Sequence, residues 1–565
     1  MTYNFFNCES DDEVMALFFG AGISFNSGLP LANQIKYIIL EQLFDDKTDF
    51  SELIESNIPF EVFIDILSTN SDISKIFEIF KNGEPNSNHI LVAKLAKIKK
   101  IKTILTTNFD LLLEKALEEE GLKEGLDFVR IYKEEDFSNF NYNELKDKLV
   151  IFKIHGTIDE WDSIRTTLKF IASKSLSEKR MSIIRYLFST GTHEKVLILG
   201  YSCSDIFDIS PQICSIQEEQ KEVIFLEHKE KIMEKIEDIK IKDENNPFKG
   251  FPGKRIFRNT DYLIMDLWKN CENLIGKYEL TKSEILWDST ISDWFSSIKD
   301  VIATNYIRGS LLEYVSNFEK AIIYYKSSLI DANNINYERG KIAANSKLGI
   351  CSDQLGNYND SKQYYEETLS ISRKLKDKSE ELKSLINLGN VYLNLGNTKK
   401  ANEYQIQALS IAEEINDIES LSKIYTNMGI LFFNSKDYEN AEKFHKKSIL
   451  IEEEIGDKKE EAKSFINLAA VYYAMAEIQP EMMAIHLKKM EYYLKKSLKL
   501  SRQVGYIVAE AKVCNNLGYL YLTLEDPEKA IKCFKISQRI YSETKQFNLL
   551  KEVHNGLSIA YNKLR

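Results

Sequence analysis

The sequence predicts a multidomain protein in which an α/β domain with a parallel β-sheet precedes an all-α solenoid of helical repeats. The chain has 565 residues, which is too long for a single hydrophobic core. Compact apolar runs alternate with helical patterns over residues 1–230, whereas residues 301–565 repeat with a period of 40. Residues 231–300 are expected to connect the two domains through helices and turns.

The composition is globular and restricts the partners that we expect. Hydrophobic residues make up 44% of the chain and charged residues 28%. The formal net charge of −12 disfavours binding to nucleic acid or to an anionic membrane surface. The N-terminus lacks the basic and apolar regions of a signal peptide, and no apolar run approaches the length of a membrane span. We therefore expect a cytoplasmic protein that binds neither nucleic acid nor membrane.

The cysteines give no sign of a metal site. The chain has seven, and they are scattered without a C-x-x-C pair. Such spacing argues against a zinc cage and against a disulfide framework, so we expect no bound metal.

The first apolar run, "VMALFFG" at residues 14–20, leads into Gly20-Ala21-Gly22 and predicts a buried strand followed by a glycine turn. Glycine is needed where the backbone takes a positive φ or approaches a ligand closely. A strand, a glycine turn and a helix start form a Rossmann-like corner that favours an anion such as a phosphate. The full G-x-G-x-x-G pattern is absent, so the glycines alone are weak evidence.

Four further apolar runs, "IKTILTTNFD", "LVIFKIHG", "KVLILGYS" and "KEVIFLEH", predict a parallel sheet with helices on both faces. Ligands of such sheets bind at the carboxyl ends of the strands, so polar residues there are candidates for a site. They are Asn108 and Asp110 after the second run, His155 after the third, and Gly200, Ser202 and Asp205 after the fourth.

The second half of the chain has a strict repeat. Gly349, Gly389 and Gly429 lie 40 residues apart, each after a leucine or methionine. A small residue follows twelve positions after each glycine and an aromatic residue three positions further on. The pattern predicts a helical solenoid and resembles tetratricopeptide repeats, with about six repeats and a capping helix at residues 551–565. A nine-residue insertion near residues 476–486 is either an adaptable, methionine-bearing contact surface or an elongated helix pair.

The motifs "GAGISFNSGLP", "TTNFD", "KIHG" and "GYS" occur in the order typical of the sirtuin family, and the first 230 residues resemble its Sir2-like NAD-binding fold. The resemblance implies NAD⁺ as the substrate. It also implies a role for each matching residue: Gly20, Ala21 and Gly22 at the pyrophosphate, Ser24, Asn108 and Asp110 around the nicotinamide, His155 at the nicotinamide ribose, and Gly200, Ser202 and Asp205 at the adenosine half.

The chemistry of breaking the nicotinamide–ribose bond fits two of these side chains. The reaction needs a polar amide that holds a water or a ribose hydroxyl, and a group that exchanges a proton near neutral pH. Asn108 and His155 are therefore the predicted catalytic residues. Asn108 could instead cap the following helix, and His155 could be a hydrogen-bonded core residue. Glu227 could hold a ribose but is better explained as a solvated strand end, and His193 and His228 are expected at the surface.

Departures from the sirtuin pattern reduce the number of reactions that we expect from this chain. No cysteine lies between His155 and Gly200, where the family carries its zinc module, so this Sir2-like domain has no zinc module. In the protein deacylases of the family that module builds the acyl-lysine cleft. Water is therefore the expected acceptor, and the predicted activity is that of an NAD⁺ hydrolase (glycohydrolase).

A Sir2-like domain joined to repeats resembles bacterial antiphage defence effectors, which deplete NAD⁺ in abortive infection. The resemblance implies a homo-oligomer whose repeat domain binds a trigger protein or peptide of phage origin. Two alternatives stay open: an NAD-dependent protein deacylase, and a non-enzymatic NAD-binding sensor or scaffold.

Overall fold

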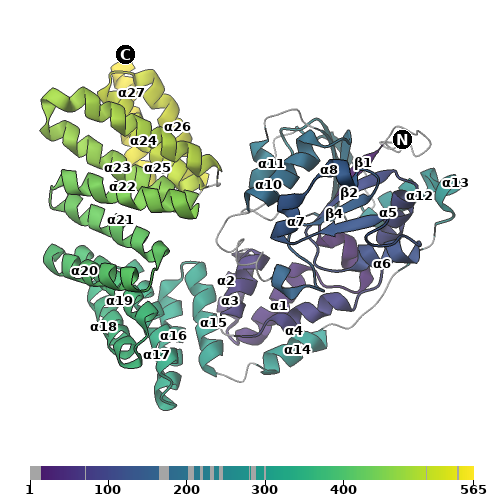
Figure 1. Ribbon diagram of the computed structural model, residues 1–565, viewed down its shortest axis with the longest axis horizontal. Helices are drawn as coiled ribbons and strands as arrows, with labels where there is room; N and C mark the ends of the chain where they lie inside the picture. Colours follow the sequence, from purple (N-terminus) through teal and green to yellow (C-terminus); the bar gives the residue numbers. More distant parts are fainter. Residues whose placement is uncertain are drawn as a thin grey trace. The chain divides into compact units, whose positions relative to one another are not determined.

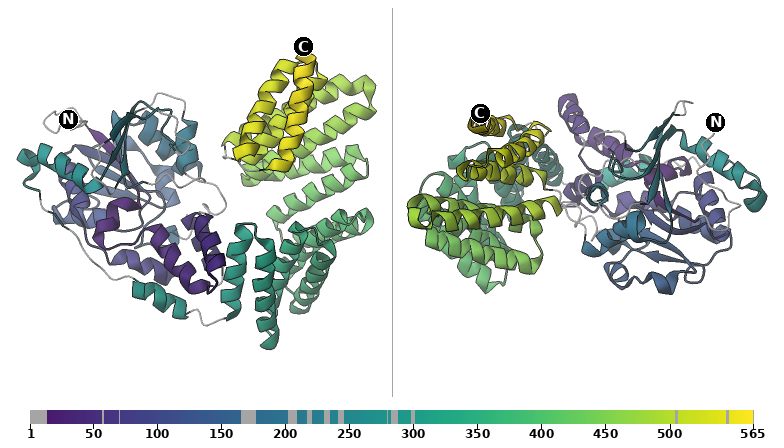
Figure 2. Two further views of the ribbon diagram at one scale, coloured as in Figure 1. Left: turned by 180° about the vertical axis from the view of Figure 1, so that it is seen from behind. Right: turned by 90° about the horizontal axis from the view of Figure 1, so that it is seen from above.

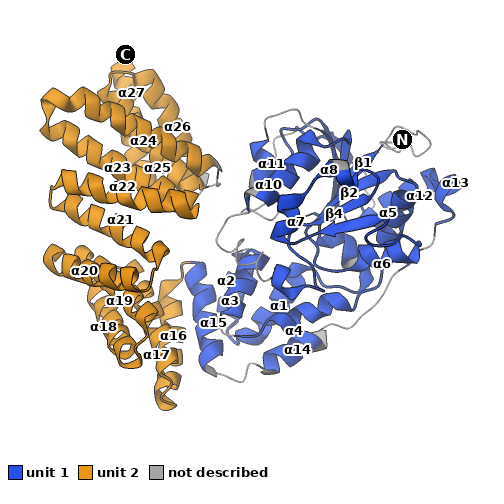
Figure 3. Ribbon diagram, viewed as in Figure 1, with its two compact units in different colours: residues 1–315 blue, residues 316–565 orange. Residues whose placement is uncertain are grey.

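The computed structural model describes residues 14–56, 58–69, 71–164, 177–201, 209–216, 221–229, 235–240, 246–278, 280–281, 288–297, 301–503, 506–543 and 546–564. The chain forms two compact units, Met1–Val315 and Ser316–Arg565 (Figure 3). No helix among the described residues combines the length and the apolar character that crossing a lipid bilayer requires.

The first unit is built on one eight-stranded sheet with the order β3-β4-β2-β1-β5-β6-β8-β7 (Figure 1). All neighbouring strands are parallel except β7, which is antiparallel to β8. The predicted parallel sheet is therefore confirmed, and its five predicted runs form β1, β2, β4, β5 and β6. The strands are β1 Met15–Phe19, β2 Ile101–Thr106, β3 Phe128–Ile131, β4 Leu149–Lys153, β5 Lys195–Leu199, β6 Glu222–His228, β7 Lys235–Asp238 and β8 Gly253–Arg258.

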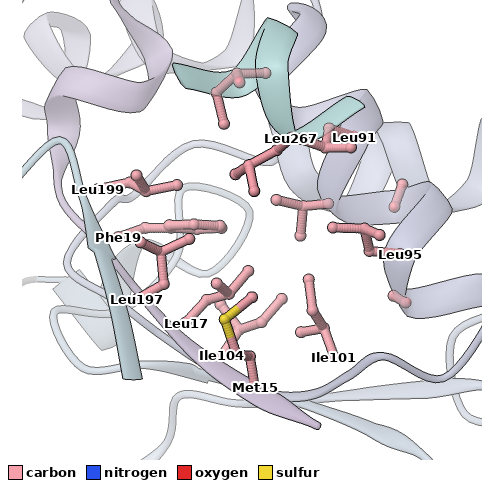
Figure 4. Packing of buried hydrophobic residues seen from close by; sticks show 14 of the residues in the cluster. Met15, Leu17, Phe19, Leu91, Leu95, Ile101, Ile104, Leu197, Leu199 and Leu267 are labelled. Atoms are coloured by element: carbon pink, nitrogen blue, oxygen red, sulfur yellow. The ribbon is translucent and has the colours of Figure 1, made fainter. Parts of the chain in front are cut away.

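Helices cover both faces of this sheet because successive side chains of a strand point to opposite sides. Met15, Leu17 and Phe19 of β1 belong to one core cluster, whereas Ala16 and Phe18 belong to another. Helices α5 and α12 pack on the first face, and α10 and α11 on the second. Figure 4 shows part of the first cluster, with residues of β1 and β5 facing Leu91, Leu95 and Leu267 of the covering helices.

The helices of the first unit lie mainly between the strands and after the last strand. They are α1 Ala32–Leu43, α2 Lys47–Glu55, α3 Phe60–Ser68, α4 Ser74–Phe77, α5 Ser87–Lys97, α6 Leu112–Glu119, α7 Glu134–Asn139, α8 Tyr142–Leu145, α10 Glu178–Arg185, α11 Ile209–Ser215, α12 Thr260–Asn270, α13 Glu272–Ile275, α14 Asp288–Ser297 and α15 Val301–Tyr314. The described part of the unit also contains two short 3₁₀-helices, η1 Ala21–Ser27 and η2 Glu78–Lys81, and a π-helical turn, η3 Tyr186–Thr190.

The predicted boundary at residue 230 falls inside this unit. Strand β8 lies between β6 and β7 in the sheet, and Trp268 of α12 is part of the core on the first face. The connecting segment therefore carries elements of the α/β core. Helix α15, which the repeat register assigns to the solenoid, also belongs to the first unit and packs on α3.

The glycines after β1 allow two stretches of backbone to touch. The Gly20 and Gly22 amides donate to the carbonyl oxygens of Leu199 and Gly200 at 3.0 and 2.9 Å. A Cβ on Gly20 would lie 2.4 Å from the Gly200 oxygen. Gly200 has a φ of +67°, and its own Cβ would lie 2.4 Å from the Ile23 nitrogen. The loops after β1 and β5 therefore pack backbone against backbone, and only glycine fits there.

The second unit is the predicted all-helical solenoid, built of helices that stack in sequence (Figures 1 and 2). The small residues that follow Gly389 and Gly429 by twelve positions, Ala401 and Ala441, are fully buried. Its helices are α16 Phe318–Asn334, α17 Glu338–Gln354, α18 Tyr358–Leu375, α19 Lys378–Asn394, α20 Thr398–Glu414, α21 Ile418–Asn434, α22 Tyr438–Ile455, α23 Lys458–Ile478, η4 Pro480–Met482, α24 Met483–Gln503, α25 Ile507–Thr523, α26 Pro527–Glu543 and α27 Phe547–Leu564.

The nine-residue insertion lengthens one helix pair. Helices α23 and α24 have 21 residues each, whereas α19, α20 and α21 have 17, and the short helix η4 joins the long pair. The elongated-pair alternative is therefore confirmed. Met482, Met483 and Ile485 are exposed at the junction, so the pair also presents apolar side chains to solvent.

In the Gly20→Ala variant, we expect the first unit to unfold at a much lower temperature than in wild type. The new Cβ would overlap the Gly200 carbonyl, and backbone cannot move aside as a flexible side chain can. We expect a loss of about 3 kcal/mol or more. Gly125→Ala is the control, because Gly125 has a φ of +83° but open space around it, so that only the backbone strain of about 1–2 kcal/mol applies. Calorimetric unfolding would contradict this account if both variants lowered the melting temperature equally.

Candidate functional site

Side chains from two strand ends meet around the hydroxyl of Ser24. Ser24 lies in η1 after β1, and Asn108 and Asp110 lie in the loop between β2 and α6. The Ser24 hydroxyl donates to Asp110 Oδ2 at 3.0 Å and accepts from Asn108 Nδ2 at 3.1 Å. All three side chains are buried. The structure thus brings together three residues to which the resemblance to the sirtuin family assigns a role at the nicotinamide.

Asp110, and not the Asn108 side chain, accepts a backbone amide at the start of α6. Asp110 Oδ1 accepts from the Leu112 amide at 3.1 Å, so Asp110 supports the start of α6 while the Asn108 side chain turns toward Ser24. The Asn108 backbone amide donates to Thr106 Oγ1 at 3.0 Å, which fixes the loop. Asn108 Oδ1 is buried without a hydrogen-bond partner among the described residues. An amide oxygen of this kind suits a ligand hydroxyl or a water.

His89 belongs to the same network, although the sequence analysis did not select it. Its Nε2 lies 3.3 Å from Ser24 Oγ, and its Nδ1 lies 2.8 Å from Asn86 Oδ1. Burial lowers the pKa of His89 to about 3, so the imidazole is neutral at physiological pH. Asn86 accepts from the His89 amide at the start of α5 and donates to the Ile23 carbonyl at 2.8 Å. The stretch "PNSNH", an asparagine cap ahead of an apolar helix, was the available signal.

His155 follows β4 and lies against the loop after β2. The residue is buried, and its ring centroid lies 6.2 Å from that of Phe109, the residue after Asn108. The Ile158 amide donates to the Phe109 carbonyl at 2.9 Å, which holds the two loops together. Gly156 has a φ of +90°, and a Cβ there would lie 2.7 Å from the Ile164 nitrogen. The turn after His155 therefore requires glycine, and it places His155 beside the loop that carries Asn108.

A cavity of about 10 Å³ lies beneath these residues, close to the lower limit for one water molecule. It is lined by Phe19, Ile23, His89, Thr106, Asn108, Asp110, Leu113, Glu114, Ile151 and Lys153. Polar and charged groups therefore border an enclosed space at the ends of β1, β2 and β4.

The other predicted site residues have mixed outcomes. The amides of Gly20 and Gly22 are paired with the β5 side, and Ala21 is exposed at the start of η1, so their contact with a pyrophosphate stays a prediction. Gly200 lies opposite them, whereas Ser202 and Asp205 lie outside the described residues.

Two of the histidines and Glu227 lie on the β5–β6 side of the sheet. His193 was expected at the surface, and this is wrong: it is buried, with Nε2 2.6 Å from the Leu187 carbonyl oxygen. His228 is exposed, as predicted. Partial burial raises the pKa of Glu227, but hydrogen bonds from Lys229 and Arg255 outweigh that effect and lower it. Because its carboxylate is already paired with both cations, the strand-end interpretation is the better one.

The comparison with protein families agrees with this architecture. Residues 102–246 match the model of the SIR2-like domain, from β2 to beyond β7. Residues 340–414, 422–455 and 511–547 match models of the tetratricopeptide repeat. The chain therefore carries a SIR2-like domain followed by tetratricopeptide repeats. The glycine motif around Gly20 lies before the matched segment.

Several solved structures are similar to parts of the chain. BtubC from P. vanneervenii is 21% identical with a TM-score of 0.32, over 36% of this chain and 82% of that one. A Rap protein complexed with competence and sporulation factor is 15% identical with a TM-score of 0.33, over 54% and 88%. Aspartyl phosphate phosphatase F from Bacillus subtilis is 12% identical with a TM-score of 0.35, over 54% and 80%. No curated protein matches the chain.

The acidic and thiol side chains do not gather into a metal centre within the part of the chain that the structure describes. No group of three or more His, Cys, Asp and Glu residues there could hold a metal ion.

Acid should destabilise the first unit through its buried histidines. Burial lowers the pKa of His89 to about 3 and of His193 to about 4, from an ordinary value of 6.5. The unfolded chain therefore binds more protons than the folded chain between about pH 4 and 6.5, and the free energy of unfolding falls as the pH falls through this window. We expect the melting temperature of the unit to drop between pH 7 and pH 5, and to drop less in His193→Gln. An equal drop in the variant would show that His193 is not held neutral.

Proposed function

We propose that the SIR2-like unit is an NAD⁺ glycohydrolase that cleaves the nicotinamide–ribose bond. The observation that supports this most is the meeting of Ser24, Asn108 and Asp110 beside His155 at the carboxyl ends of neighbouring parallel strands. Parallel α/β sheets bind their ligands at this edge. The match to the SIR2-like family adds an NAD-related domain as the context.

Each side chain has a role in the proposed reaction. The bond between C1′ and the nicotinamide nitrogen breaks, its electron pair leaves with neutral nicotinamide, and the ribose becomes oxocarbenium-like. A water oxygen bonds to C1′ and loses a proton, which gives ADP-ribose. Asn108 Oδ1 orients the water or a ribose hydroxyl, and His155 exchanges the proton. Asp110, held by Ser24, places negative charge near the positive ribose.

Water is the proposed acceptor because the segment between His155 and Gly200 contains no cysteine. A deacylase of the sirtuin type uses a zinc module there to shape its peptide cleft. Deacylation therefore ranks second, and a non-enzymatic NAD-binding sensor third.

The repeat unit is the proposed receptor for a trigger, either a protein or a peptide, that controls an oligomeric effector of antiphage defence. Tetratricopeptide-type repeats suit such a role because stacked helices present an extended surface. The exposed Met482, Met483 and Ile485 at the long helix pair offer apolar contacts of adaptable shape.

Asn108→Ala and His155→Ala should each reduce NAD⁺ consumption by about 10²-fold or more, because each removes a group that acts on water or a proton in the transition state. Release of nicotinamide, followed by chromatography, measures this loss and also separates ADP-ribose from a cyclic product. His228→Ala, an exposed histidine on β6, is the control. Asn108→Ala also removes a buried hydrogen bond, so a loss of about 1 kcal/mol in stability is expected and is checked by thermal unfolding.

The alternatives give different products in the same assay. O-acetyl-ADP-ribose formed from acetyl-lysine peptide at the rate of NAD⁺ loss would indicate the deacylase. NAD⁺ that binds but survives prolonged incubation would indicate the sensor.

Ending the chain at Val315 should uncouple NAD⁺ loss from the trigger. This end point keeps the whole first compact unit, including α15, and removes the second. We expect cells that produce the shortened chain to show the same NAD⁺ level with and without phage infection, either constantly low or constantly normal. A shortened chain that still depletes NAD⁺ only on infection would place the sensing outside the repeats.

A further inference from the structure

A buried ion pair lies directly under the candidate site. Lys153 Nζ lies 2.9 Å from Glu114 Oε1, and their side chains are 1% and 9% exposed. Lys153 is the last residue of β4, two positions before His155, and Glu114 lies in the first turn of α6, four positions after Asp110. The pair therefore joins the element that leads into His155 to the element that follows Asn108.

The ammonium group of Lys153 makes a second contact, to the backbone carbonyl of Asp110. Asp110 is thus held at both ends: its carbonyl oxygen accepts from Lys153, and its carboxylate accepts from Ser24 and from the Leu112 amide. One lysine on β4 therefore fixes the main chain of the loop that carries Asn108.

Stability alone does not explain this arrangement. Taking two charges out of water costs several kcal/mol, and replacing a buried ion pair by apolar side chains of similar size is often neutral or stabilising. Both Lys153 and Glu114 also border the 10 Å³ cavity that Asn108, Asp110 and His89 line. The charged pair therefore lies where it can define the geometry of the site.

We propose that Lys153 is a positioning residue, which sets the place of the Asn108 loop relative to His155 through Glu114 and the Asp110 carbonyl. This inference rests on the proposed function. Lys153 need not touch the substrate, because its effect passes through the backbone at Asp110. Misplacing catalytic groups by about 1 Å can cost about 10²-fold in rate, and a misplaced water-orienting amide lowers kcat more than it raises KM.

The test compares Lys153→Met with the double variant Lys153→Met/Glu114→Leu. The single variant leaves Glu114 buried without its partner, so it should lose both melting temperature and turnover. The double variant removes the stranded charge and should regain melting temperature, yet the Asp110 carbonyl still lacks its donor. We expect kcat to stay about 10²-fold below wild type in both variants, with KM for NAD⁺ changed by less than about threefold.

Lys97→Met is the matched control. Lys97 Nζ also pairs with a carboxylate and a backbone carbonyl, those of Glu120 at 3.4 and 2.7 Å, but its side chain is 53% exposed and its partner lies at the C-terminal end of α6. Its kcat should equal that of wild type. A double variant whose kcat returns to within about twofold of wild type would show that the pair serves stability only and would overturn the proposal.

Hydrogen exchange measured by mass spectrometry gives a readout that does not depend on turnover. Peptides that cover residues 105–113 should exchange faster in both variants with Lys153→Met than in wild type or Lys97→Met. Unchanged exchange there would also overturn the proposal. If the wild-type protein does not consume NAD⁺, the proposed function fails, and this exchange comparison still decides whether Lys153 holds the loop.

Discussion

The contact between the backbones after β1 and β5 is the constraint on which the site depends. A Cβ at Gly20 or Gly200 would lie 2.4 Å from backbone atoms of the opposite loop, so this approach exists only because both residues are glycine. The approach fixes η1, which carries Ser24. Ile23 in the same turn offers its carbonyl to Asn86, and Asn86 caps the helix that carries His89. Main-chain packing therefore places Ser24, and the Asn86 side chain ties the helix that carries His89 to the same turn.

The network joins the uncharged side chains of Ser24, Asn108 and His89 to the carboxylate of Asp110. His89 is neutral because of burial, so it contributes hydrogen-bonding geometry to Ser24 and not positive charge. Lys153 and Glu114 border the same cavity as Asn108 and Asp110, and their opposite charges neutralise each other. Buried polar groups that are satisfied hold their neighbours rigidly. Asn108 Oδ1 has no hydrogen-bond partner among the described residues, so this frame leaves it available for a ligand.

The sequence predicted the strands and helices that have a local apolar pattern. It missed the site residues whose partners lie far away in the sequence. Continuous apolar runs identified five central strands, and the 40-residue period identified the solenoid. Strands β3, β7 and β8, "FVRI", "KIED" and "GKRIFR", were missed because they are short or have charged residues that interrupt their apolar pattern, and they lie near the sheet edges. His89 and the Lys153–Glu114 pair were missed because their partners are distant in sequence: 65 positions separate His89 from Ser24, and 39 separate Lys153 from Glu114.

Helix α15 has the glycine spacing of the repeats but packs within the first unit. Gly309 of α15 lies 40 residues before Gly349, so α15 keeps the register of the repeats. Yet α15 packs on α3, and Arg308 donates to the carbonyl of Leu43 at the end of α1. Only residues 315–317 separate α15 from α16. The covalent path from the repeats into the SIR2-like unit therefore enters through a helix that packs within that unit, against α1 and α3.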